Sequence, residues 1–248
     1  MKQCLILLVS LLSVNYAYSK PVDVRIAAYE FPPYYSATSD QHIVGDISSA
    51  LNALQSEYNF SVVRIAPNGR YDALSADGCC DVILFEDKSW GWQHDLDYPA
   101  QVTHTLYIDR ERFVTKKAPN RGQSFFHVKG LRFGGIVGYH YAFTQNEKDH
   151  RVLEEKYGIY LTHSYEVNLQ MLLNGRLDLI MLADAYVQST LPERLRAQLL
   201  FDEQAYGTHH LAAVVNANKQ FTGKQFQRLL QQLESNGDLA RIFADYGL

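Results

Sequence analysis

The spacing of hydrophobic residues predicts alternating strands and helices along the chain. The first strand, at 24–28, alternates β-branched and polar positions. The same criteria then predict a helix at 47–58, a strand at 61–65, a short helix at 71–76, a fully apolar strand at 82–85 and a long alternating strand at 106–114. These elements form a first α/β unit.

A second unit of the same kind follows the polar, turn-rich segment 116–124. Its expected elements are a strand at 133–137, helices at 145–157 and 165–172, an apolar strand at 179–182, a strand at 210–216, and helices at 223–234 and 238–246. Repeated strand–helix–strand units predict an α/β fold, in which mostly parallel sheets are flanked by helices.

An aromatic segment ends the first strand, with the sequence Tyr29-Glu30-Phe31-Pro32-Pro33-Tyr34-Tyr35. The two prolines stop the strand, so one carboxylate and four aromatic rings are held in a stiff turn. Ligands of open α/β sheets bind at the carboxyl ends of the strands. Rings gathered at such an end indicate a pocket for a small molecule.

Residues 1–19 have the features of a cleaved signal peptide. Lys2 precedes the apolar run 4–14, and Ala17-Tyr18-Ser19 supplies small residues for cleavage. The run is shorter than the about 20 residues that span a bilayer, which argues against an uncleaved anchor. No small-residue box precedes Cys4, so a lipoprotein is not expected. We therefore expect cleavage near Ser19 and a soluble periplasmic protein.

The charge balance and the cysteine content argue against several classes of partner and cofactor. Cleavage would leave 22 basic and 27 acidic residues, a net charge of −5, which argues against a nucleic-acid partner. Cys79 and Cys80 are adjacent, and α-carbons about 3.8 Å apart are closer than the about 4.4–6.8 Å of an ordinary disulfide. We therefore expect small core residues here rather than a strained disulfide. No metal-ligand spacing surrounds them, and neither a metal nor a cofactor is expected.

The order of these signals resembles the extracellular solute-binding proteins of family 3, the periplasmic receptors typified by polar amino-acid binders. The resemblance covers most of the mature chain. It rests on Phe31-Pro32-Pro33-Tyr34, Gly45-Asp46, Asp81-Val82-Ile83, Gly135-Ile136-Val137-Gly138-Tyr139, Gly175-Arg176-Leu177-Asp178, Gly237-Asp238-Leu239-Ala240-Arg241-Ile242 and Tyr246-Gly247.

The resemblance implies two α/β lobes that are joined by two hinge strands and close on a ligand. Lobe 1 would comprise 20–115 and 211–248, and lobe 2 would comprise 116–210. The hinges would be the strands at 106–114 and 210–216.

The segments that correspond to the family's binding residues differ in this chain. Amino-acid binders carry a carboxylate-gripping arginine at the position that matches Trp92, and this sequence has no arginine between Asp81 and Asp109. Lys88 offers only a mobile point charge there. In lobe 2, the hydroxyl pair of the family is replaced at 139–144, and Asp184 stands one residue beyond the expected ammonium-binding aspartate. Asp184 is equally explained as a helix N-cap.

The expected ligand-binding residues are Tyr29, Glu30, Tyr34, Glu86, Trp90, Trp92, Tyr139, Tyr141 and Asp184. Rings and carboxylates together favour a ligand with an apolar or aromatic face and a cationic or hydroxyl-rich part. A simple amino acid held by an arginine clamp is not expected.

The function that follows is capture of a small molecule in an aromatic interlobe cleft, for an ABC-type importer or for a sensor. The partner would be a membrane permease or sensor, and the protein would be a monomer without catalytic residues. Two alternatives remain. One is a lyase-like enzyme of the same fold acting on small ring acids, with Glu30, Glu86 or His140 as proton donor or acceptor. The other is an interaction module that senses a ligand without transport.

Overall fold

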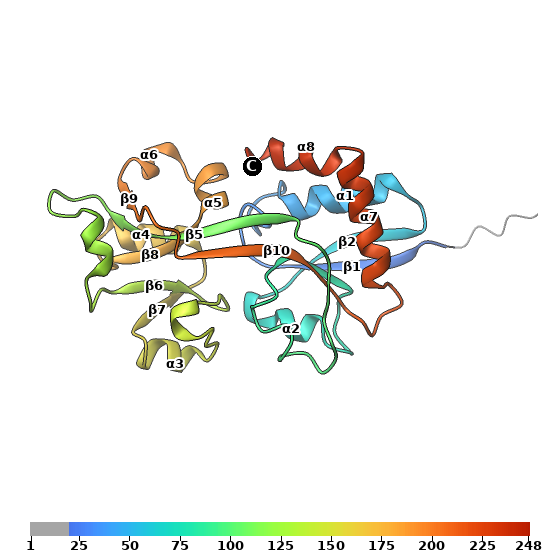
Figure 1. Cartoon of the computed structure of the whole chain (residues 1–248), viewed down its shortest axis with the longest axis horizontal. Helices are drawn as coiled ribbons and strands as arrows, with labels where there is room; N and C mark the ends of the chain where they lie inside the picture. The colour runs from blue at the N-terminus through green and yellow to red at the C-terminus, as the bar shows by residue number, and fades with distance from the viewer. Residues whose placement is uncertain (1–19) are drawn as a thin grey trace, which may run out of the picture.

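Two groups of strands are connected by a pair of long antiparallel strands, β5 (Tyr107–Lys116) and β10 (Gly207–Val215) (Figure 1). The structure is a computed structural model and describes residues 20–248, so the expected signal peptide lies outside the described residues. The strands form one hydrogen-bonded path in the order β2-β1-β3-β10-β5-β8-β6-β7, with β4 on β10 and β9 on β5. The expected two-lobed α/β fold with two hinge strands is confirmed.

The first lobe contains the sheet around β1. Its elements are β1 (Val22–Ala28), α1 (Ile43–Leu54), β2 (Tyr58–Arg64), α2 (Arg70–Ala73), β3 (Val82–Glu86), β4 (Gln101–Val102), α7 (Gly223–Ser235) and α8 (Asp238–Asp245). β1 runs parallel to β2 and β3, and Val24 and Ile26 on it are fully buried. α7 and α8 both contact α1, so the end of the chain returns to the lobe in which β1 lies (Figure 1).

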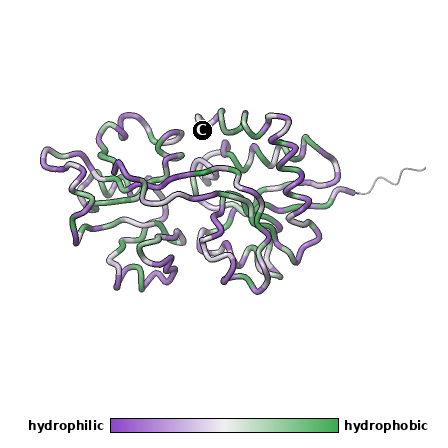
Figure 2. Tube along the Cα trace, viewed as in Figure 1, coloured by the Kyte–Doolittle hydropathy of each residue, from purple (hydrophilic) through white to green (hydrophobic). Residues whose placement is uncertain are grey.

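The second lobe lies between the two hinge strands in the sequence. Its elements are β6 (Phe133–Ile136), α3 (His150–Glu155), β7 (Ile159–Thr162), α4 (Tyr165–Leu173), β8 (Leu179–Ala183), α5 (Asp184–Ser189), α6 (Glu193–Arg196) and β9 (Leu199–Phe201). β6 runs parallel to β7 and β8, and every residue of β8 is buried. Figure 2 shows hydrophobic positions along the strands and hydrophilic positions on the outer loops.

The hinge strands lie close to their expected positions. Their amino-terminal halves pair with each other, from Gly207 opposite Glu111 to Leu211 opposite Tyr107. Beyond this ladder β10 continues on β3 and β5 continues on β8. β10 therefore joins the first-lobe strands to β5, and β5 joins β10 to the second-lobe strands. Within residues 20–248 no helix has the length and apolar character needed to cross a membrane.

Two local expectations were wrong. The helix expected at 145–157 begins only at His150, because Gln145 and Asn146 adopt left-handed φ angles of 59° and 58° and Asp149 caps the helix. Cys79 and Cys80 are joined in a disulfide, with α-carbons 3.7 Å apart, rather than standing as separate thiols in the core. Cys80 is nonetheless fully buried.

A candidate ligand-binding cleft between the lobes

A small cavity lies where the lobes meet. Its walls combine first-lobe, second-lobe and hinge residues, namely Tyr29, Phe31, Arg70, Trp90, Glu111, Tyr139 and His140. The free volume is about 10 Å³, which is room for roughly one water molecule. The lobes are therefore closed on each other at this point, and side chains fill this part of the junction.

Arg70 occupies the centre of this junction, at the start of the short helix α2. Its side chain is almost fully buried, at 2% exposure. One terminal nitrogen donates to the Tyr29 hydroxyl at 2.8 Å, and the other donates to the Gly138 carbonyl of the second lobe at 2.6 Å. The guanidinium carbon also lies 5.2 Å from the Tyr29 ring centre, 5.4 Å from that of Tyr71 and 5.9 Å from that of Trp90. The cation is thus surrounded by three aromatic rings.

Glu86 supplies a buried carboxylate beside Arg70. Opposite Phe85 the β3–β10 ladder shifts register, from Ala212 facing Glu86 to Ala213 facing Leu84, and Phe85 has a left-handed φ of 63°. Such a bulge re-aims the side chains that follow it. One Glu86 oxygen accepts from the Trp92 indole at 3.0 Å and lies 3.8 Å from an Arg70 nitrogen. Burial raises the pKa of Glu86, and the charge of Arg70 opposes that rise.

His140 closes the cavity from the second lobe. Its Nε2 is 2.7 Å from the Tyr71 hydroxyl, and its ring stacks parallel to Trp90 with centres 6.5 Å apart. Burial, and secondarily the charge of Arg70, lower the pKa of His140 to about 3. The imidazole is therefore neutral in the closed protein at ordinary pH.

Unsatisfied polar atoms converge on this junction. Within residues 20–248, the buried side-chain polar atoms without a hydrogen-bond partner are Arg70 Nε, Glu86 Oε1, His140 Nδ1 and the Tyr165 hydroxyl. The first three belong to the junction itself, and the Tyr165 ring packs edge-on against Tyr139 in its wall. Buried polar atoms are normally paired, because an unpaired one costs about 1–3 kcal/mol. Their concentration here marks a place suited to a polar ligand.

Direct contacts hold the lobes together across the junction. Arg70 bonds to Gly138, Tyr71 to His140, the Tyr139 hydroxyl to the Glu30 carbonyl at 2.9 Å, Asn146 to the Ser89 carbonyl at 3.4 Å, and Lys148 to Asp95. An open groove of about 570 Å³ lies outside the junction and shares Arg70 and His140 with the cavity. These two side chains therefore separate the cavity from that groove.

Comparisons with known proteins address the fold. No protein-family model matches the chain, and no curated protein matches it. Among solved structures, an ancestral arginine-binding protein bound to arginine is similar at a TM-score of 0.69 and 16% identity, over 92% of this chain and 99% of that one. The chain has the two-lobed fold of periplasmic binding proteins.

Two further solved structures share this binding-protein fold. The Bordetella pertussis BvgS VFT2 domain, as a double mutant, matches at a TM-score of 0.65 and 15% identity, over 90% of this chain and 93% of that one. A histidine kinase sensor domain with similarity to periplasmic binding proteins matches at a TM-score of 0.67 and 14% identity, over 92% of this chain and 96% of that one. The fold therefore occurs both in an arginine-binding protein and in a sensor domain.

Within this binding-protein fold, four of the expected site residues meet at the junction. Tyr29, Trp90 and Tyr139 line the cavity, and Glu86 lies next to Arg70. Glu30 reaches the junction through its backbone carbonyl only, since its carboxylate accepts from the Ser36 hydroxyl and the Ala37 amide.

Three other expected residues have partners inside the protein. The Tyr34 hydroxyl donates to Asp109 at 2.7 Å, and the Trp92 indole donates to Glu86. The Tyr141 hydroxyl accepts from the Ile136 amide at 2.6 Å. These contacts show buried side chains with structural partners, and the three residues do not line the cavity.

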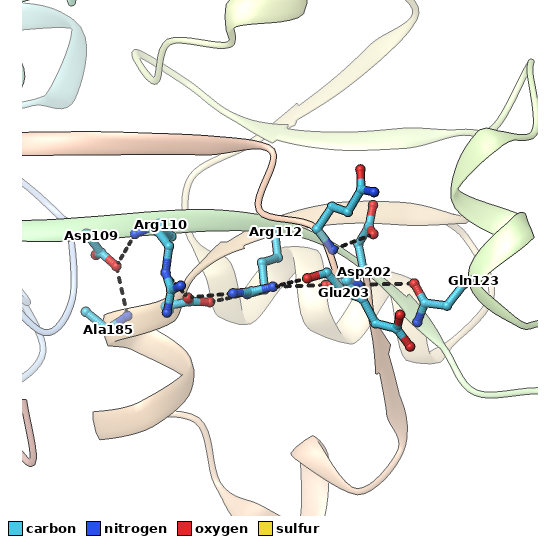
Figure 3. Close-up of polar contacts among 9 residues, drawn as sticks. Asp109, Arg110, Arg112, Gln123, Ala185, Asp202 and Glu203 are labelled. Atoms are coloured by element: carbon cyan, nitrogen blue, oxygen red, sulfur yellow. Dashed lines mark hydrogen bonds and ion pairs between the residues drawn. The ribbon is translucent and has the colours of Figure 1, made fainter.

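Asp184 also lies outside the cavity lining. Its carboxylate pairs with Arg112 at 2.7 Å and with Arg110 at 3.1 Å, beside the hinge strand β5. Figure 3 shows Arg110 and Arg112 converging there, with Arg112 also reaching the backbone oxygens of Asp202 and Glu203. Asp184 is the first residue of α5 and not its N-cap, which is Ala183.

Sequence reasoning missed Arg70, Phe31 and Glu111 as cavity residues. The family pattern places its arginine after the apolar strand at 82–85, whereas the structure supplies a guanidinium from α2, before that strand. Nothing in the local pattern distinguishes Arg70 from a solvent-exposed arginine. For Glu111, its position in an expected hinge strand was the one feature of the sequence that could have indicated a place between the lobes. In the structure its carboxylate accepts a hydrogen bond from His209 at 2.9 Å.

Proposed function

We propose that this protein captures a small molecule between its two lobes, as a periplasmic solute-binding or ligand-sensing protein without catalytic activity. The observation that carries the proposal is the convergence of unpaired buried polar atoms of Arg70, Glu86 and His140 on an aromatic interlobe cavity. Two solved structures that share the fold support it, because one is named as an arginine-binding protein and the other as a sensor domain.

The proposed ligand is small, carries an apolar or aromatic face and has a polar or cationic part. Tyr29, Trp90 and Tyr139 would contact the face. Glu86 would accept hydrogen bonds from the polar part. A simple amino acid gripped through its carboxylate fits less well, because the terminal nitrogens of Arg70 are already engaged by Tyr29 and Gly138.

The proposed partner is a membrane permease or sensor, and the protein acts as a monomer after removal of its signal peptide. Residues 20–115 and 211–248 form the proposed first lobe, and 116–210 the second. Hinge motion of β5 and β10 would open the cleft for ligand entry.

Native mass spectrometry of protein purified from the periplasm, without refolding, tests the proposal. We expect a co-purified small molecule in the wild type and in Tyr160→Ala, and its loss in Tyr29→Ala. Tyr160 is a matched control, because it is 56% exposed on β7 and outside the cavity lining. A metabolite library that neither binds nor shifts the melting temperature, or equal loss in both variants, would overturn the proposal.

A further inference from the structure

The surroundings of Arg70 have the composition of a binding site for a guanidinium ion. Rings of Tyr29, Tyr71 and Trp90 lie within 5.9 Å of its guanidinium carbon. A cation at such distances is attracted to the faces of aromatic rings. The Tyr29 hydroxyl and the Gly138 carbonyl accept its terminal N–H groups. We call Tyr29, Tyr71, Trp90, Glu86 and the Gly138 carbonyl the cage.

Glu86, the carboxylate of the cage, does not form a close, fully hydrogen-bonded ion pair with Arg70. Arg70 and Glu86 approach to 3.8 Å, beyond hydrogen-bond distance, and each keeps an unpaired buried atom. A buried ion pair stabilises a fold only when its geometry is excellent and its other polar atoms are satisfied. This pair meets neither condition, so fold stability alone does not account for its retention.

Arg70 belongs both to the cage and to the contact that holds the two lobes together. Its side chain extends from the first lobe and bonds to the second lobe at Gly138. It also borders both the buried cavity and the open groove outside it. Withdrawal of this one side chain would break an interlobe hydrogen bond and join the cavity to the groove.

We propose that the cage is a guanidinium-recognition site which the chain fills with its own Arg70 in the closed form. An external ligand that carries a guanidinium group enters when Arg70 withdraws, so Arg70 acts as a tethered competitor. The ligand class rests on the proposed function, whereas recognition of guanidinium by the cage does not.

Chemical complementation tests the cage directly. Arg70→Ala in the mature protein deletes a group equivalent to ethylguanidinium, which is therefore the probe. N-ethylurea is the neutral control of nearly the same shape, and ethylammonium is the non-planar cation. Arg112→Ala is the matched variant, because it also deletes an ion-paired arginine but lies outside the cavity lining. Titration calorimetry measures each affinity.

We expect Arg70→Ala to bind ethylguanidinium about tenfold or more tightly than the wild type does, and N-ethylurea not at all. Arg112→Ala should behave as the wild type. The proposal would be overturned if Arg70→Ala and the wild type bound ethylguanidinium with equal affinity. It would also be overturned if Arg70→Ala bound N-ethylurea as tightly as ethylguanidinium. Failure to co-purify any metabolite would instead count against the proposed function and leave this result unaffected.

Loss of Arg70 leaves Glu86 buried without its counter-charge, so Arg70→Ala is expected to be less stable. If it is unfolded, the melting temperature provides the readout, and ethylguanidinium but not N-ethylurea should restore folding. The double variant Arg70→Ala, Glu86→Gln removes the unpaired charge. It should fold and bind ethylguanidinium more weakly than Arg70→Ala does. Tight binding without the carboxylate, or no rescue in either variant, would contradict the cage.

Discussion

The hydroxyl of Tyr34 donates a 2.7 Å hydrogen bond to the carboxylate of Asp109, which connects the turn after β1 to the hinge strand β5. Asp109 is buried at 3% exposure and also accepts from the amides of Ala185 and Arg110 (Figure 3). One carboxylate thus joins the first lobe, the hinge and the start of α5. This relationship makes Tyr34 a hinge-anchoring residue.

Tyr34→Phe should lower the free energy of unfolding by about 1–3 kcal/mol at neutral pH, because a buried carboxylate loses a donor. Burial already raises the pKa of Asp109, and loss of Tyr34 would raise it further. The native variant then binds more protons than the wild type in mildly acidic solution, so the stability deficit should shrink as pH falls. Urea denaturation over a pH series measures this. Tyr160→Phe is the exposed control, and a deficit that grows in acid would contradict the assignment.

His140 should make the closed protein sensitive to acid. Its pKa is lowered from 6.5 to about 3, so the unfolded chain binds more protons between these values. The contribution of His140 to the free energy of unfolding is therefore expected to fall by about 1.4 kcal/mol per pH unit as pH drops through this window. His140→Gln should flatten that part of the curve, whereas His94→Gln, at an exposed position, should not. NMR titration of the His140 ring gives the pKa directly, and a value near 6.5 would refute the prediction.

Glu86→Gln should be far more destabilising than Asp184→Asn. The first change leaves the buried Arg70 cation without its carboxylate, at a cost of about 3–5 kcal/mol. The second weakens partly exposed ion pairs with Arg110 and Arg112, worth about 1 kcal/mol or less. Chemical denaturation of the two variants gives the comparison. Similar losses in both would mean that the Arg70–Glu86 pair contributes no more than a surface contact.

The disulfide between Cys79 and Cys80 predicts a simple mass difference. The intact mature protein should be two hydrogen masses lighter than the same chain after reduction, and it should not react with a maleimide before reduction. Immediate labelling of two thiols in freshly purified, unreduced protein would show that the cysteines are separate.

The hydrophobic pattern predicted the architecture well, because buried strands such as 82–85 and 179–182 are apolar throughout. Ring positions at strand ends were also informative, and Tyr29, Trp90 and Tyr139 do meet between the lobes. Long-range partners could not be predicted. Asp184 pairs with arginines on a strand more than 70 positions earlier in the sequence, and Arg70 is buried through contacts to residues 41 and 68 positions away.

The adjacency of β5 and β10 makes the second lobe an insertion between two neighbouring strands of one sheet. β1 and α8, on either side of that insertion in the sequence, lie in the same lobe and would move together in the proposed hinge motion. Fluorescent reporters attached near β1 and near α8 would keep a constant separation while the cleft opens and closes. Under the proposed function, a membrane partner would therefore have to contact both lobes to distinguish the ligand-bound protein from the ligand-free one.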